Sequence, residues 1–323
     1  MNDIQPHASP VPTCARSARL LFSSFLCALF LLGSGAGQFA NAGEASGHFR
    51  AEGGDFSGVI SPTHAAAYST REQYDARRTV IEIVLSGAPV DALAAAAAPN
   101  PHIQAINQDA LINHDYVLLW LSPEGQLSMN ATFGKTMTQF LERSGGALQA
   151  EISVNTPERV AGRLFSKKPL TTLGGGRYTV DLKFDTEVSR LPKGLPLKKG
   201  GDAPGKALHK FLAAAEAKKW PAIKAGASPA ALNSFAASYR SDQENAEYAL
   251  DLLRMWLPKW SAKTSSASRL KIIGGEQRGD IADLEIEGDM HPGMPALYLA
   301  RMRKNGALWQ FETATLLGLL TPR

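Results

Sequence analysis

The sequence predicts an α+β protein in which a β-rich, antiparallel, sandwich-like domain precedes an α+β cone of three helices and a curved antiparallel sheet. Three observations support this fold class. Short β-branched or alternating runs separated by Gly/Pro turns fill residues 47–188. A run with three prolines and four glycines follows at 189–205 and opposes both helix and sheet. Within 206–321 the apolar period then changes from 3.6 to 2.

Residues 1–42 have the features of a secretory signal peptide. Arg16 and Arg19 precede an uncharged apolar run at 20–32, and small residues stand one and three positions before the expected cut after Ala42. The apolar run is shorter than the roughly 20 residues that a membrane-spanning helix needs. We therefore expect a Sec-type signal, a bacterial periplasmic or extracellular protein, and no transmembrane segment in the mature chain.

Both cysteines of the chain, Cys14 and Cys27, lie inside this signal segment. A mature chain without cysteine has neither disulfides nor thiolate ligands, and the histidines form no HxH, HxxxH or HExxH motif. The sequence thus predicts no metal and no cofactor. Removal of Arg16, Arg19 and Asp3 lowers the formal charge from +4 to +3. This mild excess predicts no nucleic-acid partner.

The first domain contains short runs with the composition of strands. They lie at 78–86, 116–122, 126–133, 148–154, 160–166 and 178–188. Apolar residues alternate with polar ones along the last of these runs, which predicts one buried face. The alanine-rich segment at 90–98 is expected to form a helical turn. For 136–143 two alternatives stay open, a short helix or a further strand.

The second domain begins with three helical patterns. The first, at 205–220, repeats apolar residues at i, i+3, i+4 and i+7. The second begins at Ser228, an N-cap residue followed by Pro229 at the first helical position. The third covers 243–257 and ends before Pro258.

Strand patterns complete the second domain. Gly274 and Gly275 are expected to interrupt the chain before a strand at 280–287. Asn305-Gly306 between two alternating runs, 296–304 and 307–317, is a strong hairpin signal. We expect 280–287 to pair beside this hairpin. One face of the hairpin is expected to carry Tyr298, Ala300, Met302, Trp309 and Phe311.

The second domain resembles the nuclear-transport-factor-2-like (SnoaL-like) superfamily. The resemblance rests on the first helical pattern, the Trp256-Leu257-Pro258 helix end, the approach from Gly274 to Ala282, and the closing hairpin with Trp309. It implies a cone whose sheet curves around a hydrophobic pocket, and dimerisation through that sheet. The superfamily includes isomerases, dehydratases, cyclases and non-catalytic binding domains, so the fold does not give the function. The first domain resembles generic secreted β-sandwich domains.

An enzyme with this fold needs an acid or base that points into the cone. The first candidates are Asp283 and Glu285, although the alternation around them does not show which carboxylate points inward. Weaker candidates are Glu287, Glu312, Tyr239 and Tyr248. An apolar ligand pocket in the cone would be lined by Tyr248, Trp256, Tyr298 and Trp309. We expect the third helix to bury Tyr248, Leu252, Met255 and Trp256.

No segment of the sequence carries a convergent catalytic motif such as G-x-S-x-G. The sequence therefore predicts a secreted or periplasmic, non-enzymatic accessory or binding protein. Its partner would be an apolar small ligand or another envelope protein, and it would form a homodimer through the cone sheet. The alternative is a small-molecule isomerase, dehydratase or hydrolase that uses an inward-facing carboxylate of the cone.

Overall fold

The computed structural model describes residues 43–53, 57–134, 138–171, 176–236, 240–258 and 270–321, with the backbone alone for 138–143. The predicted signal segment with its two cysteines and the candidate Tyr239 lie outside the described residues. Residues 39–323 belong to one compact unit.

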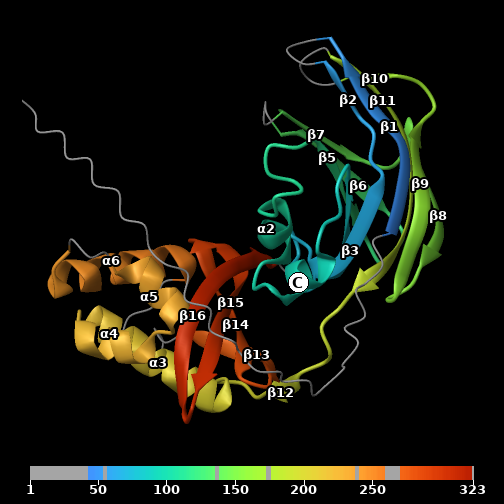
Figure 1. The fold of residues 1–323 in the computed structure, drawn as a ribbon. Coiled ribbons are helices and arrows are strands. Elements are labelled where there is room, and N and C mark those ends of the chain that lie inside the picture. The colour runs from blue at the N-terminus through green and yellow to red at the C-terminus, as the bar shows by residue number, and fades with distance from the viewer. Residues whose placement is uncertain are drawn as a thin grey trace, which may run out of the picture. The chain divides into compact units, whose positions relative to one another are not determined.

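The described strands form two sheets, and nearly all of their pairings are antiparallel (Figure 1). The first sheet has the order β7-β6-β5-β4-β3-β1-β11-β9-β8, and off this path β2 pairs with β1 and β10 with β11. Its strands are β1 (Gly43–Glu52), β2 (Gly58–Ile60), β3 (His64–Arg71), β4 (Thr79–Ser86), β5 (Tyr116–Leu121), β6 (Leu127–Phe133), β7 (Thr138–Arg143), β8 (Leu148–Asn155), β9 (Arg159–Ser166), β10 (Leu170–Thr171) and β11 (Arg177–Ser189).

The first sheet curls around its own apolar face. Phe49 on β1 stacks on Tyr178 of β11, with ring centroids 5.5 Å apart, and also meets Phe133 of β6 at 6.0 Å. Strand β6 lies four places away from β1 in the sheet order, so this contact requires strong curvature. The predicted alternation along β11 is confirmed, because its buried residues share this core. One curled antiparallel sheet thus encloses the core of the first half.

Two short helices cover the other face of β3–β5. Helix α1 (Ala92–Ala97) begins after Asp91, whose side chain accepts a hydrogen bond from the Ala94 amide, and α2 (Pro101–Ile106) begins after the N-cap Asn100. Their alanines pack against Tyr68, Val84 and Leu118 of the sheet. The helical turn predicted at 90–98 is confirmed. The two alternatives for 136–143 are resolved in favour of strand β7.

The helices of the second half follow the predicted order, with one addition. They are α3 (Asp202–Glu216), α4 (Trp220–Gly226), α5 (Pro229–Phe235) and α6 (Asp242–Trp256). Helix α3 begins before Pro204, because proline is tolerated in a first turn. Helix α4 was not predicted, although Pro221 stands in its own first turn. Helix α6 begins with a capping box between Ser241 and Glu244.

The second sheet has the order β12-β13-β14-β15-β16. Its strands are β12 (Leu195–Leu197), β13 (Lys271–Arg278), β14 (Ile281–His291), β15 (Met294–Asn305) and β16 (Leu308–Leu319). The predicted pairing of 280–287 beside the Asn305-Gly306 hairpin is confirmed. The predicted interruption at Gly274 and Gly275 is wrong, because β13 continues through a bulge. A Cβ atom at Gly275 would lie 2.1 Å from the Asp283 carbonyl oxygen, which explains the glycine.

Helices α3–α6 pack on one face of the second sheet (Figure 1). Phe311 of β16 stacks on Phe211 of α3 at 4.9 Å, and Phe235 of α5 lies 6.1 Å from Phe311. Tyr298 and Met302 belong to the same core, and Trp309 packs at its margin, so the predicted face of the hairpin is confirmed. The result is a mixed but strand-rich protein.

The opposite face of the second sheet contacts the β3–β4 turn of the first. The Ala76 amide donates to the Leu319 carbonyl at 2.7 Å, and the Leu319 amide donates to the Gln73 carbonyl at 2.9 Å. Ala76 is fully buried against Leu297 and Leu320. We call this contact the turn–β16 seam. The homodimer predicted through the cone sheet stays a prediction, but part of that face is covered by the same chain.

Gly318 is the tightest point of the turn–β16 seam. A Cβ atom there would lie 2.8 Å from the carbonyl oxygens of Glu72 and Gln73, and its φ of +156° disfavours other residues. We expect Gly318→Val to lower the free energy of unfolding by about 1–3 kcal/mol, as overpacking does, measured by urea titration. The matched control is Gly87→Val, because Gly87 has open space around its Cβ position. Equal effects of the two substitutions would contradict this role of Gly318.

Candidate ligand-binding cleft

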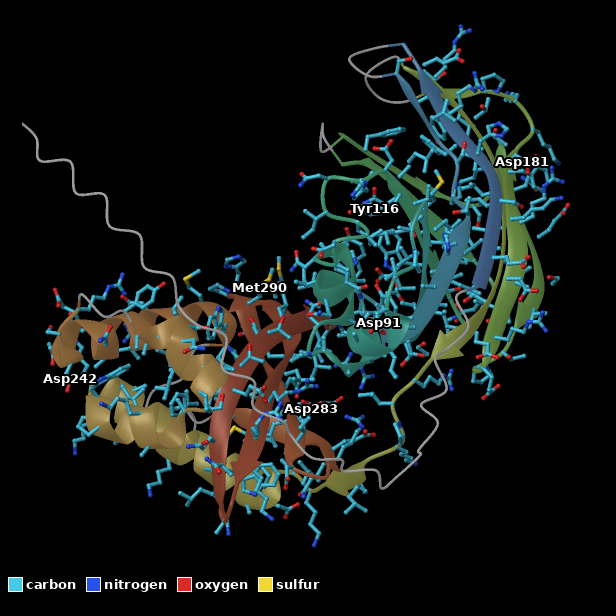
Figure 2. All side chains as sticks on the ribbon, viewed as in Figure 1. Asp91, Tyr116, Asp181, Asp242, Asp283 and Met290 are labelled. Carbon is cyan, nitrogen blue, oxygen red and sulfur yellow. The ribbon has the colours of Figure 1, made fainter. Side chains whose placement is uncertain are left out.

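A cleft of about 670 Å³ lies between the two sheets. Its walls come from the end of β3, from the α1–α2 segment, from residues 189–196 and from strands β13–β15. Charged side chains dominate the wall formed by the second sheet, where Asp283 lies on the side away from α3–α6 (Figure 2). The cleft is therefore separate from the aromatic core between the second sheet and α3–α6.

Asp283 and Arg301 form a bidentate ion pair at the base of the cleft. They are directly opposite each other on β14 and β15. Arg301 Nε donates to Asp283 Oδ1 at 2.6 Å, and Nη2 donates to Oδ2 at 2.9 Å. The two residues are 8% and 7% exposed, so the geometry is protected from water. Arg301 Nη1 also donates to the Ala97 carbonyl at 2.7 Å, which joins α1 to the second sheet.

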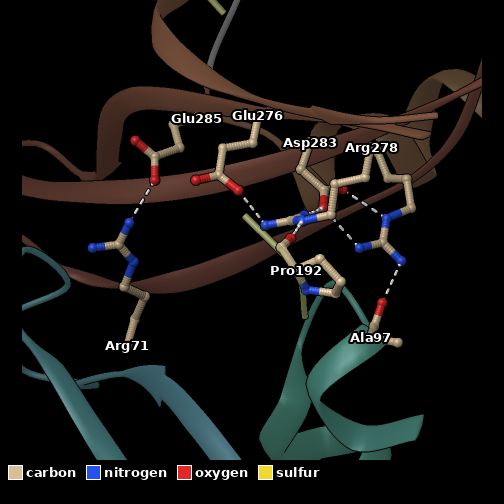
Figure 3. Close-up of polar contacts among 8 residues, drawn as sticks. Arg71, Ala97, Pro192, Glu276, Arg278, Asp283 and Glu285 are labelled. Atoms are coloured by element: carbon tan, nitrogen blue, oxygen red, sulfur yellow. Dashed lines mark hydrogen bonds and ion pairs between the residues drawn. The ribbon is translucent and has the colours of Figure 1, made fainter. Parts of the chain in front are cut away.

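Arg278 extends this network along β13 (Figure 3). Its Nη1 donates to Asp283 Oδ2 at 3.3 Å, and its Nη2 bonds to Glu276. Its Nε donates to the Pro192 carbonyl at 3.0 Å. One guanidinium thus fixes two carboxylates and the proline-rich run against the sheet. Three arginine N–H groups therefore donate to the Asp283 carboxylate.

Glu285 and Arg71 close the other end of the network. Arg71 Nη2 donates to Glu285 Oε1 at 2.6 Å, joining β3 to β14 (Figure 3). Arg190 also lines the cleft, and its side chain has no ion pair or hydrogen bond among the described residues. The cleft therefore contains four arginines (Arg71, Arg190, Arg278 and Arg301) and three carboxylates (Glu276, Asp283 and Glu285), and each carboxylate already has an arginine partner.

The structure answers the question that the sequence left open, and neither Asp283 nor Glu285 points into the helix-covered core. Their neighbours Ala282, Leu284 and Ile286 face the helix-covered core, so the two carboxylates face the cleft on the other side of β14. Of the weaker candidates, Glu287 pairs with Lys271, and Glu312 accepts two bonds from Arg303 at 2.8 and 3.0 Å.

The four residues predicted to line an apolar pocket do not line one common pocket. Tyr298 is buried in the core between the second sheet and α3–α6, and Trp256 and Trp309 pack at the margin of that core. Burial raises the pKa of Tyr298, and the charge of Asp289 raises it further. Tyr248 is 39% exposed, and the Arg240 guanidinium lies 4.1 Å above its ring. The predicted burial of Tyr248 and Met255 is wrong, since Met255 is 76% exposed.

A second polar cluster lies beneath α2 and was not predicted. Glu82 is fully buried on β4, directly between Tyr68 of β3 and Trp120 of β5. Tyr68 Oη donates to Glu82 Oε1 at 2.7 Å, and Trp120 Nε1 donates to Oε2 at 3.1 Å. His102 Nδ1 of α2 lies 2.8 Å from Oε1. We call these four residues the Glu82 cluster.

The Glu82 cluster shifts the ionisation of its members. Burial, and then the nearby Glu82 charge, raise the pKa of Tyr68 far above its usual range. Burial alone would lower the pKa of His102, but the hydrogen bond and charge of Glu82 outweigh it, and the pKa of His102 is raised. A sequence signal existed: Glu82 is the single charge inside an apolar strand run.

Comparisons of the chain with protein-family models, with curated proteins and with solved structures give no match. Within the described ranges, every helix is too short or too polar to cross a lipid bilayer. The arrangement of the cleft therefore carries the functional argument.

Proposed function

We propose that this protein is a periplasmic or extracellular binding protein whose cleft holds a small ligand through an anionic group, a carboxylate or phosphate. The observation that carries this proposal is the charge arrangement of the cleft. Three arginines are committed to three carboxylates, and the fourth, Arg190, has no partner within the described part of the chain. A guanidinium that faces a cleft binds carboxylate and phosphate oxygens through two parallel hydrogen bonds.

The size and lining of the cleft agree with a small ligand. Its volume of about 670 Å³ lies inside the range of about 300–1,000 Å³ that small-molecule sites occupy. Hydroxyl groups of Ser69 and Thr70 stand in the same wall as Arg71 and supply further hydrogen-bond donors. The remaining walls contain Pro99, Leu299 and other apolar side chains that would contact the ligand's uncharged part.

The proposed location and domain arrangement rest on the sequence patterns. The signal-like segment supports export, and the succession of α3–α6 and β13–β16 supports a nuclear-transport-factor-2-like cone at 206–321. In this proposal the first domain, at 47–188, is the curled first sheet and not a sandwich. Residues 189–205 are the linker between this domain and the cone. These assignments are part of the proposal.

An enzyme that uses Asp283 or Glu285 is the less supported alternative. A general acid or base must be free to exchange a proton with the substrate. Both oxygens of Asp283 instead accept hydrogen bonds from arginines, and Glu285 is bonded to Arg71. These pairs stabilise the walls of a binding cleft and leave little capacity for proton transfer.

Substitution of Arg190, the arginine without a partner among the described residues, tests the binding proposal. Calorimetric titration of the purified protein with inorganic phosphate, citrate and glutamate is expected to show at least one binding anion. We expect Arg190→Gln to weaken that binding by roughly 10- to 100-fold, because a hydrogen bond to a charged group contributes about 1.5–3 kcal/mol.

The matched control is Arg254→Gln, the same change of charge at an exposed position of α6 that does not line the cleft. It should bind the anion as the wild type does. Failure of all three anions to bind, or equal weakening by both substitutions, would overturn the proposed cleft site.

A further inference from the structure

The Glu82 cluster connects the short helix α2 to the first sheet through the titratable pair His102 and Glu82. Three of its members, Tyr68, Glu82 and Trp120, are cross-strand neighbours on β3, β4 and β5. The fourth, His102, comes from α2, and its side chain is 36% exposed. Because Glu82 is fully buried, the imidazole of His102 is its only potentially cationic partner among the described residues.

The same α1–α2 segment also contacts the second sheet. The Ala97 carbonyl at the end of α1 accepts the hydrogen bond from Arg301 at 2.7 Å. Asn100, the N-cap of α2, donates from Nδ2 to Thr315 Oγ1 of β16 at 3.4 Å. Between these contacts, Ala98 and Pro99 line the cleft. The segment is thus a wall of the cleft with two hydrogen bonds to the second sheet. To the first sheet it is joined by the His102–Glu82 contact and by the packing of its alanines.

We propose that the α1–α2 segment is a proton-responsive wall of the cleft, which protonated His102 holds against Glu82 and which loosens as His102 loses its proton. This regulation rests on the proposed function of the cleft as a binding site. Looser attachment of α2 would displace Pro99 and Ala98 and so change the access of the anionic ligand.

The direction of the pH effect follows from the shift at His102. A histidine whose pKa is higher in the folded protein than in the unfolded chain stabilises the fold fully below its usual pKa of about 6.5. That contribution is lost as the pH rises through the raised pKa of His102. The wall is therefore expected to be tight at acidic pH and looser at alkaline pH.

The other groups around the pair do not reverse this direction. Tyr68 faces Glu82 from β3, and Tyr116 of β5 lies near Tyr68. The raised pKa of Tyr68 keeps its hydroxyl protonated as a donor, and Trp120 does not titrate. Neutral His102 can still donate to the Glu82 carboxylate, but the attraction between a cation and an anion is then lost, so the contact is weaker.

Hydrogen–deuterium exchange of the full chain tests this proposal without any ligand. Protection factors of the amides in α1 and α2 are measured at pH 5.5 and pH 9, after correction for intrinsic exchange. We expect protection in the wild type to fall roughly fivefold at the higher pH, as the loss of about 1 kcal/mol implies. Three variants accompany it: His102→Asn, which retains a donor near the Nδ1 position but does not titrate; His102→Leu, which removes the donor; and the control His291→Asn.

We expect His102→Asn to abolish the pH dependence, His102→Leu to lower protection at both pH values, and His291→Asn to behave as the wild type. A pH-independent wild type, or an unchanged pH dependence in His102→Asn, would overturn the proposal. If His102→Asn does not fold, the wild-type profile still decides it. Anion binding without pH-dependent exchange would refute this inference alone, whereas pH-dependent exchange without anion binding would refute the proposed function alone.

Discussion

Asp283→Leu is expected to lower the free energy of unfolding by about 3–5 kcal/mol, because it leaves Arg301 buried without its carboxylate. Arg301 is 7% exposed, and two of its nitrogens donate to Asp283. The remaining bond to the Ala97 carbonyl does not neutralise the charge. Urea-induced unfolding followed by circular dichroism measures the effect.

The double variant Asp283→Leu/Arg301→Met distinguishes the effect of the unpaired Arg301 charge from the effect of changing the side chain at position 283. Replacing both partners of a buried ion pair by apolar side chains is often neutral, so we expect most of the lost stability to return. A double variant as unstable as Asp283→Leu would show that the unpaired charge is not the cause. Since Arg278 also bonds to Asp283, the recovery is expected to be incomplete.

Phe311→Ala is expected to lower the free energy of unfolding by about 3–5 kcal/mol, the usual cost of truncating a buried phenylalanine. Phe311 is fully buried and contacts the rings of Phe211 and Phe235. The control is Leu308→Ala on the same strand, which is 64% exposed and should change stability by no more than about 0.5 kcal/mol. A cost for Phe311→Ala near that of the control would indicate that the core between the second sheet and its helices is loosely filled.

Local signals made most of the second half predictable. The helix starts at Ser228 and Ser241, the stop before Pro258 and the Asn305-Gly306 hairpin are set by neighbouring residues. The buried face of α6 was nevertheless predicted wrongly. It is formed by Asn245, Ala246, Ala249, Leu250 and Leu253, whereas the prediction followed Tyr248, Met255 and the other large side chains.

Contacts between distant segments could not be predicted in the same way. The curl of the first sheet depends on β1 pairing with β11, and the cleft depends on Arg71 meeting Glu285, 214 residues further along the chain. The carboxylates of β14 look like solvated surface charges in the sequence, because their arginine partners stand on other strands. No periodicity within β14 shows that Asp283 is enclosed by two guanidinium groups.

The turn–β16 seam also has a consequence for the order of folding. The Arg77 side chain donates to the Thr321 carbonyl at 2.8 Å across a separation of 244 residues. This contact cannot form until residue 321 has been synthesised, and closing so large a loop is slow compared with forming a local hairpin. The two sheets are therefore expected to fold first, with the seam joining them in a later step. The cleft would be the last part of the protein to be assembled, and binding assays during refolding should lag behind the recovery of secondary structure.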